Sequence, residues 1–243
     1  MILIALVVLA IILLISVGVW IAFNPSIPIY SDSSGPETEE KLIALTFDDG
    51  PHPSTTLSII KTLHDANVKA TFFVVGKNVR AHPEIVKKLH AQGHLIGNHS
   101  GQHTYSMLPR TNKTVLRDIN ETNEIIASVI GQTPTFYRPP FGFRTPWSAR
   151  LIRKAGYKIV TWNDMTTDYW GLATDKLVTN ILKQARPGGI IVMHDGAEGL
   201  AHGTSHVTQA LPTILTELQR QGYRFVLLDE LFGVPGYRPH KDT

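Results

Sequence analysis

The feature that most constrains the fold of this chain is a regular alternation between short β-type runs and segments with helical periodicity. The helical segments carry end signals, such as Ser54 at the start of one and Gly93 at the end of another. Strands and helices that alternate in this way form a parallel sheet with helices on its outside. We therefore predict an α/β fold with strands at residues 42–47, 70–75, 94–97, 136–138, 157–162, 190–194 and 224–228. This number of units favours closure into a barrel, although the periodicity alone is compatible with an open sheet.

The N-terminal segment from Ile2 to Phe23 is 22 residues long and carries no charged side chain. A helix of that length, at about 1.5 Å per residue, crosses the roughly 30 Å hydrocarbon core of a bilayer. A cleaved signal peptide is the alternative, but no basic start, shorter apolar core or small-x-small cleavage site is clear before Asn24. We therefore predict an uncleaved N-terminal transmembrane helix.

The stretch after this helix is acidic, and no basic stop signal would hold it in the cytoplasm. We predict a single-pass protein of the cell membrane with its domain outside the cytoplasm, and secretion after signal cleavage is the alternative. Pro, Ser and Gly residues before Lys41 indicate a linker. The predicted division is an anchor at 1–23, a linker at 24–40 and one domain at 41–243.

The composition excludes several classes of protein. Charged residues make up 18% of the chain, the net charge is +3 and the basic residues are scattered, so we expect no nucleic-acid partner. The chain has no cysteine, so a bound metal would need histidine, aspartate or glutamate ligands. Its 243 residues suffice for one domain with a single core, and we expect a monomer.

Polar residues gather at the predicted C-terminal ends of the strands. In a parallel barrel those ends meet on one face, where the loops build the active site. The residues expected to share this cleft are Asp48 and Asp49 after the first strand, His99 and His103 after the third, Arg138 at the fourth, Asp168 after the fifth and His194 at the sixth.

His99 and His103 are four residues apart and can project from one side of a helical turn. With one carboxylate they form a metal site that leaves coordination positions open for water and substrate. Each motif alone has a simpler explanation, because an HxxxH pair is often solvated and Asp48 to Pro51 could be an ordinary turn. Their placement at equivalent strand ends favours the metal site.

Hydrolysis of an amide also needs a base for the water and an acid for the departing amine. Asp48, beside the proposed ligand Asp49, is the predicted base. His194 is the predicted acid, because a neighbouring carboxylate such as Asp168 would raise its pKa and keep it protonated.

Over about residues 41–231 the chain resembles the polysaccharide deacetylases of the NodB-homology type, the fourth carbohydrate esterase family. The resemblance implies a distorted (β/α) barrel that is smaller than the eight-unit type, in agreement with about seven parallel strands. The matching motifs are Thr46-Phe47-Asp48-Asp49-Gly50-Pro51, His99-Ser100-Gly101-Gln102-His103, Arg138-Pro139-Pro140-Phe141-Gly142, Asp168-Tyr169 and Ile191-Val192-Met193-His194.

Carried over to this chain, the resemblance implies that Asp49, His99 and His103 hold a divalent metal ion. Zn²⁺ is the expected ion, with Co²⁺, Mn²⁺ or Ni²⁺ as alternatives. The resemblance also implies that Asp48 is the catalytic base and that Arg138 holds it.

The same resemblance implies that the backbone N–H of Phe141 stabilises the tetrahedral oxyanion, a contribution of about 2.7–4 kcal/mol for one fixed donor. Asp168 would adjust the pKa of His194. Ile191 and Trp162 would line the pocket for the acetyl methyl group.

Two positions depart from the family pattern. Met165 stands where an aspartate is usual, which puts the hydrogen bonds of that carboxylate in doubt, and Asp164 is the nearest replacement. Ile191 stands where leucine is usual, and this swap keeps the site apolar.

The predicted function is removal of N-acetyl groups from an N-acetylglucosamine-containing polysaccharide, and peptidoglycan is the expected substrate. Peptidoglycan is expected because the short linker would confine the domain to polymer near the membrane. A chitooligosaccharide deacetylase and a xylan O-acetyl esterase are the alternatives with related chemistry. An inactive wall-binding module is the alternative of another class, because a fold alone does not prove activity.

Overall fold

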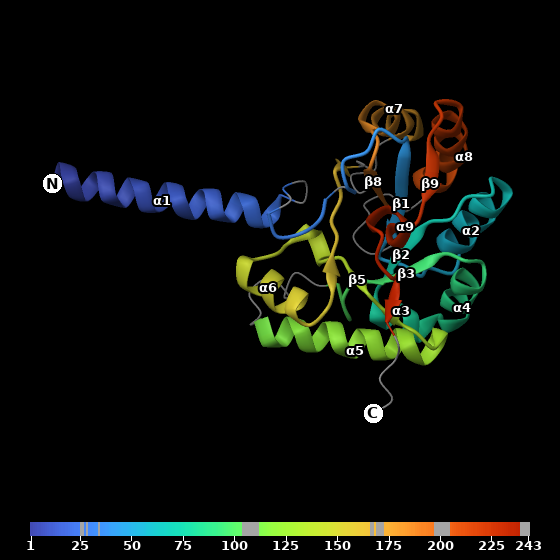
Figure 1. The fold of residues 1–243 in the computed structure, drawn as a ribbon, viewed down its shortest axis with the longest axis horizontal. Coiled ribbons are helices and arrows are strands. Elements are labelled where there is room, and N and C mark those ends of the chain that lie inside the picture. Colours follow the sequence, from blue (N-terminus) through green and yellow to red (C-terminus); the bar gives the residue numbers. More distant parts are fainter. Residues whose placement is uncertain are drawn as a thin grey trace.

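The computed structural model describes residues 1–24, 27, 29–33, 35–103, 112–165, 168, 173–196 and 205–238 (Figure 1). One curled sheet lies at the centre, helices surround it, and α1 projects away from the rest of the molecule. The strands are β1 (Leu42–Asp48), β2 (Thr71–Val74), β3 (Leu95–Asn98), β4 (Thr133–Pro134), β5 (Phe136–Tyr137), β6 (Lys158–Ile159), β7 (Asp164–Met165), β8 (Gly189–His194), β9 (Arg224–Val226) and β10 (Tyr237–Arg238). The helices are α1 (Ile2–Phe23), α2 (Thr55–Asp65), α3 (Gly76–Ala81), α4 (Pro83–Ala91), α5 (Asn112–Ile130), the 3-10 turn η2 (Pro140–Gly142), α6 (Pro146–Lys154), α7 (Thr174–Gln184), α8 (Ser205–Arg220) and α9 (Leu228–Phe232).

The strand order is β6-β5-β3-β2-β1-β8-β7, and all neighbours are parallel. β8 pairs along one side of β1, while β9 and β2 share the other side, β9 at the start of β1 and β2 at its end. The sheet curls into a half-barrel that ends at β6 and β7. This confirms the predicted α/β fold with about seven parallel strands in a distorted barrel.

All seven predicted strands are present, with small shifts of their ends. The sequence did not predict β7 or the antiparallel pair of β4 with β10. Each of these three strands has only two residues, which is too short for an alternating pattern to appear.

Alternate residues of β1 face opposite sides of the sheet. Ile43, Leu45 and Phe47 pack outward in the cluster that α2, α7 and α8 cover. Ala44 packs inward, and Thr46 and Asp48 follow it on the same side. The interior of the half-barrel therefore changes from apolar to polar toward the C-terminal end of β1.

Residues 31–33, 35 and 36 of the predicted linker lie against the sheet. Asp32 forms a parallel bridge with Val160, just beyond β6, and the Gly35 N–H donates to the Gly188 carbonyl at 2.8 Å. Ser31 is buried and its hydroxyl lies 2.9 Å from that of Thr161. The segment runs from the edge strand β6 to the start of β8, so this part differs from a free tether.

α1 is long and apolar enough to cross a membrane, over Ile2–Ala22, and none of its apolar window is buried in the protein. An N-terminal signal sequence has the same properties, so both predictions for this segment remain open.

Gly97→Ala is predicted to destabilise the sheet, because a Cβ at this position would lie 2.5 Å from the Phe73 ring. Overpacking of this kind lowers the free energy of unfolding by about 1–3 kcal/mol. Urea denaturation of the full chain in detergent measures the change. Lys87→Ala, at an exposed position on α4, is the control and should stay within about 0.5 kcal/mol of the wild type. Equal stability of the two variants would contradict the close packing at Gly97.

Candidate metal and active site

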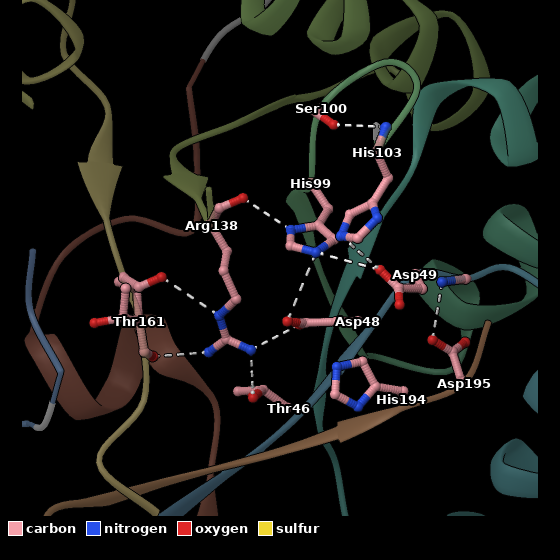
Figure 2. Close-up of polar contacts among 12 residues, drawn as sticks. Thr46, Asp48, Asp49, His99, Ser100, His103, Arg138, Thr161, His194 and Asp195 are labelled. Carbon is pink, nitrogen blue, oxygen red and sulfur yellow. Dashed lines mark hydrogen bonds and ion pairs between the residues drawn. The ribbon is translucent and has the colours of Figure 1, made fainter. Parts of the chain in front are cut away.

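The polar residues at the strand ends converge as the sequence predicted. Figure 2 shows Asp48, Asp49, His99, His103 and Arg138 pointing toward one another, although they come from β1, β3, β5 and the loops that follow. Because parallel strands end at the same edge of a sheet, the fold itself brings these distant residues together.

Asp49, His99 and His103 form a compact set of metal ligands. Their ligand atoms all lie within 4.8 Å of one another. Asp49 Oδ1 lies 3.4 Å from His99 Nε2 and 3.2 Å from His103 Nε2. Both Asp49 carboxylate oxygens are buried, and neither accepts a hydrogen bond from the described residues. A buried carboxylate of this kind is costly unless a cation balances it, so the cluster fits a divalent ion.

The protonation states of the cluster suit metal binding. His99 Nδ1 lies 2.8 Å from the Arg138 carbonyl, which only accepts, so Nδ1 carries the proton and Nε2 faces Asp49 with its lone pair. Burial and the neighbouring His99 lower the pKa of His103 to about 4, which keeps its imidazole neutral. Burial opposes ionisation of Asp49, but its close contact with the His99 ring and the positive charge of His194 hold its pKa below the usual value.

His99 itself responds to the negative charge of the site. Burial lowers its pKa, but the negative charges of Asp48 and Asp49 beside its ring raise it more. The same negative potential that attracts a proton to His99 would attract a cation.

Asp48 is held by the fully buried Arg138. Nη1 of Arg138 donates to Asp48 Oδ1 at 2.7 Å and to Thr46 Oγ1 at 2.8 Å, and Nη2 donates to the Thr161 carbonyl at 3.0 Å. The second Asp48 oxygen lies 3.8 Å from His99 Nε2. The carboxylate is thus fixed by one oxygen and presents the other toward the metal ligands.

His194 and Asp168 form a second pair at the site. The His194 backbone N–H donates to Asp168 Oδ2 at 2.8 Å, and Nδ1 lies 3.1 Å from both carboxylate oxygens. Burial lowers the pKa of His194, but the charge and hydrogen bond of Asp168 outweigh it and raise the pKa to about 10. His194 is therefore a protonated imidazolium at neutral pH, as an acid requires.

Phe141 lies in the turn η2 with a left-handed backbone conformation, φ 57° and ψ 13°. Its ring centre is 4.7 Å from that of His103. The turn therefore lies beside the metal ligands, where the predicted oxyanion contact of the Phe141 N–H would be made.

The prediction that Ile191 lines the pocket is wrong. Ile191 pairs with Leu45, and both pack in the outer cluster under the helices. Side chains alternate along a strand, so Val192 and His194 share the inward face of β8. Trp162, the other predicted wall residue, lies in the interior with its ring 5.5 Å from the Arg138 guanidinium.

Two parts of the fourth motif stay untested. Tyr169 lies outside the described residues. The backbones of Asp164 and Met165 form β7, but their side chains also lie outside the described part, so the consequence of Met165 remains a prediction.

Asp195, which the sequence analysis did not single out, contacts the loop that carries Asp49. Its Oδ1 accepts the Gly50 N–H at 3.1 Å, and its Oδ2 accepts the Thr56 hydroxyl at 2.6 Å. Its backbone N–H donates to the Asp48 carbonyl at 3.0 Å. Burial raises the pKa of this carboxyl to about 7, and the charges of Asp49 and Asp48 add to the shift. The sequence signal that could have identified Asp195 is its position directly after His194, at the end of a strand.

The fold and site agree with the comparisons to known proteins. Residues 35–160 match the family model described as polysaccharide deacetylase. A peptidoglycan-N-acetylglucosamine deacetylase of Bacillus cereus is 36% identical over 200 residues, which cover 82% of this chain and 70% of that protein. A chitooligosaccharide deacetylase of Rhizobium leguminosarum bv. trifolii is 33% identical over 196 residues, 76% of this chain and 89% of that protein.

A solved structure is also similar. The Bc1960 peptidoglycan N-acetylglucosamine deacetylase, in complex with 4-naphthalen-1-yl-N-oxidanyl-benzamide, has a TM-score of 0.80 and 34% identity over 86% of this chain and 95% of that chain. The chain therefore belongs to the polysaccharide deacetylase family. The family's metal-dependent deacetylation fits the cluster of Asp49, His99 and His103.

Asp195→Ala is predicted to weaken metal binding about 10–100-fold, because residues that orient metal ligands typically contribute that much. Asp195→Asn should lose less, because its side-chain oxygen can still accept the Gly50 N–H. Competition with a chromophoric chelator, with the full chain in detergent, measures the affinity. Asp175→Ala, an exposed acid on α7, is the control. Wild-type affinity in Asp195→Ala would show that Asp195 does not position the ligands.

Proposed function

We propose that this protein is a membrane-anchored, metal-dependent deacetylase that removes N-acetyl groups from N-acetylglucosamine-containing polysaccharide, with peptidoglycan as its substrate. The observation that carries the proposal is the three-ligand cluster of Asp49, His99 and His103, with a fixed carboxylate and a protonated imidazole beside it. Relatives whose names give the same activity support the choice of polymer.

The ligand set favours Zn²⁺, because two imidazoles and one carboxylate with open positions are typical of catalytic zinc sites. Co²⁺, Mn²⁺ and Ni²⁺ accept similar ligands and are the alternatives. A divalent ion bound there would polarise the acetamide carbonyl and lower the pKa of a bound water.

The residues of the chain would supply the proton transfers. Asp48, fixed by Arg138, would accept a proton from the attacking water through its free oxygen. His194 would donate its proton to the departing amine. The backbone N–H of Phe141 would stabilise the developing oxyanion, because a preorganised donor is effective where charge develops.

The acetyl methyl group would lie in an apolar pocket. Val192, which shares the inward face of β8 with His194, replaces Ile191 as the proposed wall residue, together with Trp162. A β-branched side chain at this position keeps the pocket small and dry.

Related activities remain the competing proposals. A chitooligosaccharide deacetylase, whose name one relative carries, or a xylan O-acetyl esterase would use the same residues. An inactive wall-binding module is the weaker proposal, because the metal ligands, the base with its arginine and the acid with its aspartate are all present and in contact.

Asp48→Asn and Asp49→Ala are predicted to have separable effects. The amide in Asp48→Asn cannot take a proton, so turnover should fall about 10²–10⁴-fold while bound metal is retained. Asp49→Ala removes a ligand and should lose metal and activity together, as should chelator treatment of the wild type. Metal analysis beside acetate release checks this. Equal metal loss in both variants would show that the two roles are shared or reversed.

Asp168→Asn is predicted to shift the basic limb of the kcat/KM pH profile to lower pH. A general acid works only while protonated, so activity is lost as the pH rises through its pKa. Asp168 raises the pKa of His194, so removing its charge makes His194 deprotonate at lower pH. The profile of Asp175→Asn, an exposed acid on α7, should match the wild type. An unchanged basic limb in Asp168→Asn would show that His194 is not the general acid.

Acetate release from peptidoglycan is predicted to exceed that from chitin oligomers and from acetylated xylan, for equal amounts of full-length protein in detergent. Parallel assays on the three polymers measure specific activity. A preference for xylan or for small chitin oligomers would refute the choice of peptidoglycan and leave the metal and acid–base proposals standing.

A further inference from the structure

Arg144 joins the end of α1 to the turn that carries Phe141. Its backbone N–H donates to the Ala22 carbonyl at 3.2 Å. Its buried guanidinium donates to the carbonyls of Ile27 and Gly142, at 2.5 and 3.0 Å. The last turn of α1 therefore contacts the domain directly, beside the active site.

The attachment continues in the residues that follow. The Asp32 N–H donates to the Ile159 carbonyl and the Asp32 carbonyl accepts from the Thr161 N–H, both at 2.9 Å. The Asp32 carboxylate lies 3.0 Å from Lys158 Nζ. Backbone pairing on both sides of Asp32 fixes its position against the end of β6, while Arg144 holds the last turn of α1 on the domain.

Large apolar side chains are exposed beside this attachment. After α1, the described residues include three that are well exposed, Ile29 at 50%, Leu57 at 36% and Trp147 at 71%. Ile29 is two residues from Ile27, and Trp147 is three residues from Arg144. At no more than about 3.6 Å per residue, their Cα atoms lie within roughly 11 Å of Ile27 and Arg144, and Arg144 contacts the last turn of α1. Two of the three therefore gather where α1 leaves the domain.

α6 adds positive charge to the same region. Its inner side buries Ser148, Ala149 and Ile152, while Trp147, Arg150, Arg153 and Lys154 are exposed. The helix contains no acidic residue. Figure 1 shows α6 next to the end of α1, at the side of the molecule from which α1 projects. An exposed tryptophan with nearby arginine and lysine is typical of the boundary between a membrane and water.

We propose that α6, together with Ile29, is a second membrane contact, which binds the headgroups of anionic lipids and fixes the domain beside its anchor. The proposal rests on the proposed retention of α1 in the membrane. Trp147 and Ile29 enter the interfacial region, and Arg150, Arg153 and Lys154 pair with lipid phosphates.

The proposed membrane contact determines which polymer strands the active site can reach. Phe141 contacts His103, and the turn that carries Phe141 is bonded through Gly142 to Arg144. The metal site is thus held at a short, fixed distance from the lipid surface, which selects polymer strands that lie against the membrane.

A sugar-binding platform is the competing role for an exposed tryptophan near an active site. Two observations favour lipid instead. The charged residues of α6 are all positive, which suits anionic headgroups, and Trp147 lies close to the residues that attach α1.

Single cysteines test the proposal cleanly, because the chain has none of its own. Arg150→Cys places a nitroxide on the proposed contact while keeping Trp147, and Leu57→Cys places one on α2 as the exposed control. The full chain is reconstituted in nanodiscs with phosphatidylglycerol or with phosphatidylcholine alone. Collisions with oxygen, which enters lipid, are compared with collisions with a nickel complex, which stays in water.

The expected result is a several-fold higher oxygen-to-nickel ratio at position 150 than at position 57, larger with phosphatidylglycerol. Adding Trp147→Ala and Lys154→Glu should return the ratio at position 150 to the control value. Acetate release from a small soluble substrate should be unchanged in all variants, which shows that the domain is folded.

Equal ratios at positions 150 and 57 with phosphatidylglycerol would overturn the membrane contact. If Trp147→Ala then raises KM for polymer in detergent, the tryptophan belongs to sugar binding instead. A high ratio at position 150 in a protein without deacetylase activity would refute the proposed function and support this contact, so the two failures are distinguishable.

Discussion

The site depends on one buried charge, the guanidinium of Arg138. A buried charge is unfavourable unless it is paired and hydrogen-bonded, and Arg138 meets both conditions. Its donors reach Asp48 and Thr46 on β1 and the Thr161 carbonyl beyond β6, so it ties together parts of the half-barrel that do not pair as strands. Its backbone carbonyl orients His99. One residue thus fixes both the proposed base and a metal ligand, and a smaller cation such as lysine could not make these contacts at once.

The backbone around the ligands is strained, and nearby side chains hold it in place. Asp49, Ser100, His103 and Phe141 all have positive φ angles, which cost about 1–2 kcal/mol for residues other than glycine. The Asn78 amide donates to the Asp49 carbonyl at 2.8 Å. Strain of this kind persists only where the surroundings over-determine the conformation. Asn78 and Asp195 bond to the backbone of Asp49 and Gly50, so they support the conformation of this metal ligand although neither would touch the ion.

A feature of the structure could be predicted from the sequence where a local pattern of residues determines it, and not where it depends on distant contacts. Alternation between strand and helix patterns is local and repeated, so it predicted the parallel sheet and placed Asp48 and His194 at strand ends. The side that a residue faces needs the strand register, which is why Ile191 was chosen for the pocket and Val192 is the residue that faces it. The contacts of Asp32, Gly35 and Asp195 join residues more than a hundred positions apart in the chain, and no local pattern reports them.

The negative charges of Asp48 and Asp49 contribute to every raised pKa at the site, and they also explain why the ligands need a cation. Asp48, Asp49 and Asp195 are buried within one region, and Arg138 directly pairs only with Asp48. The charges of Asp48 and Asp49 contribute to the raised pKa of His194, and they add to the effect of burial on the pKa of Asp195. A divalent ion at Asp49 would offset this negative charge and lower the affinity of His194 and Asp195 for protons. The environment thus couples metal binding to proton release, and Asp168 makes the largest favourable contribution to keeping the proton on His194.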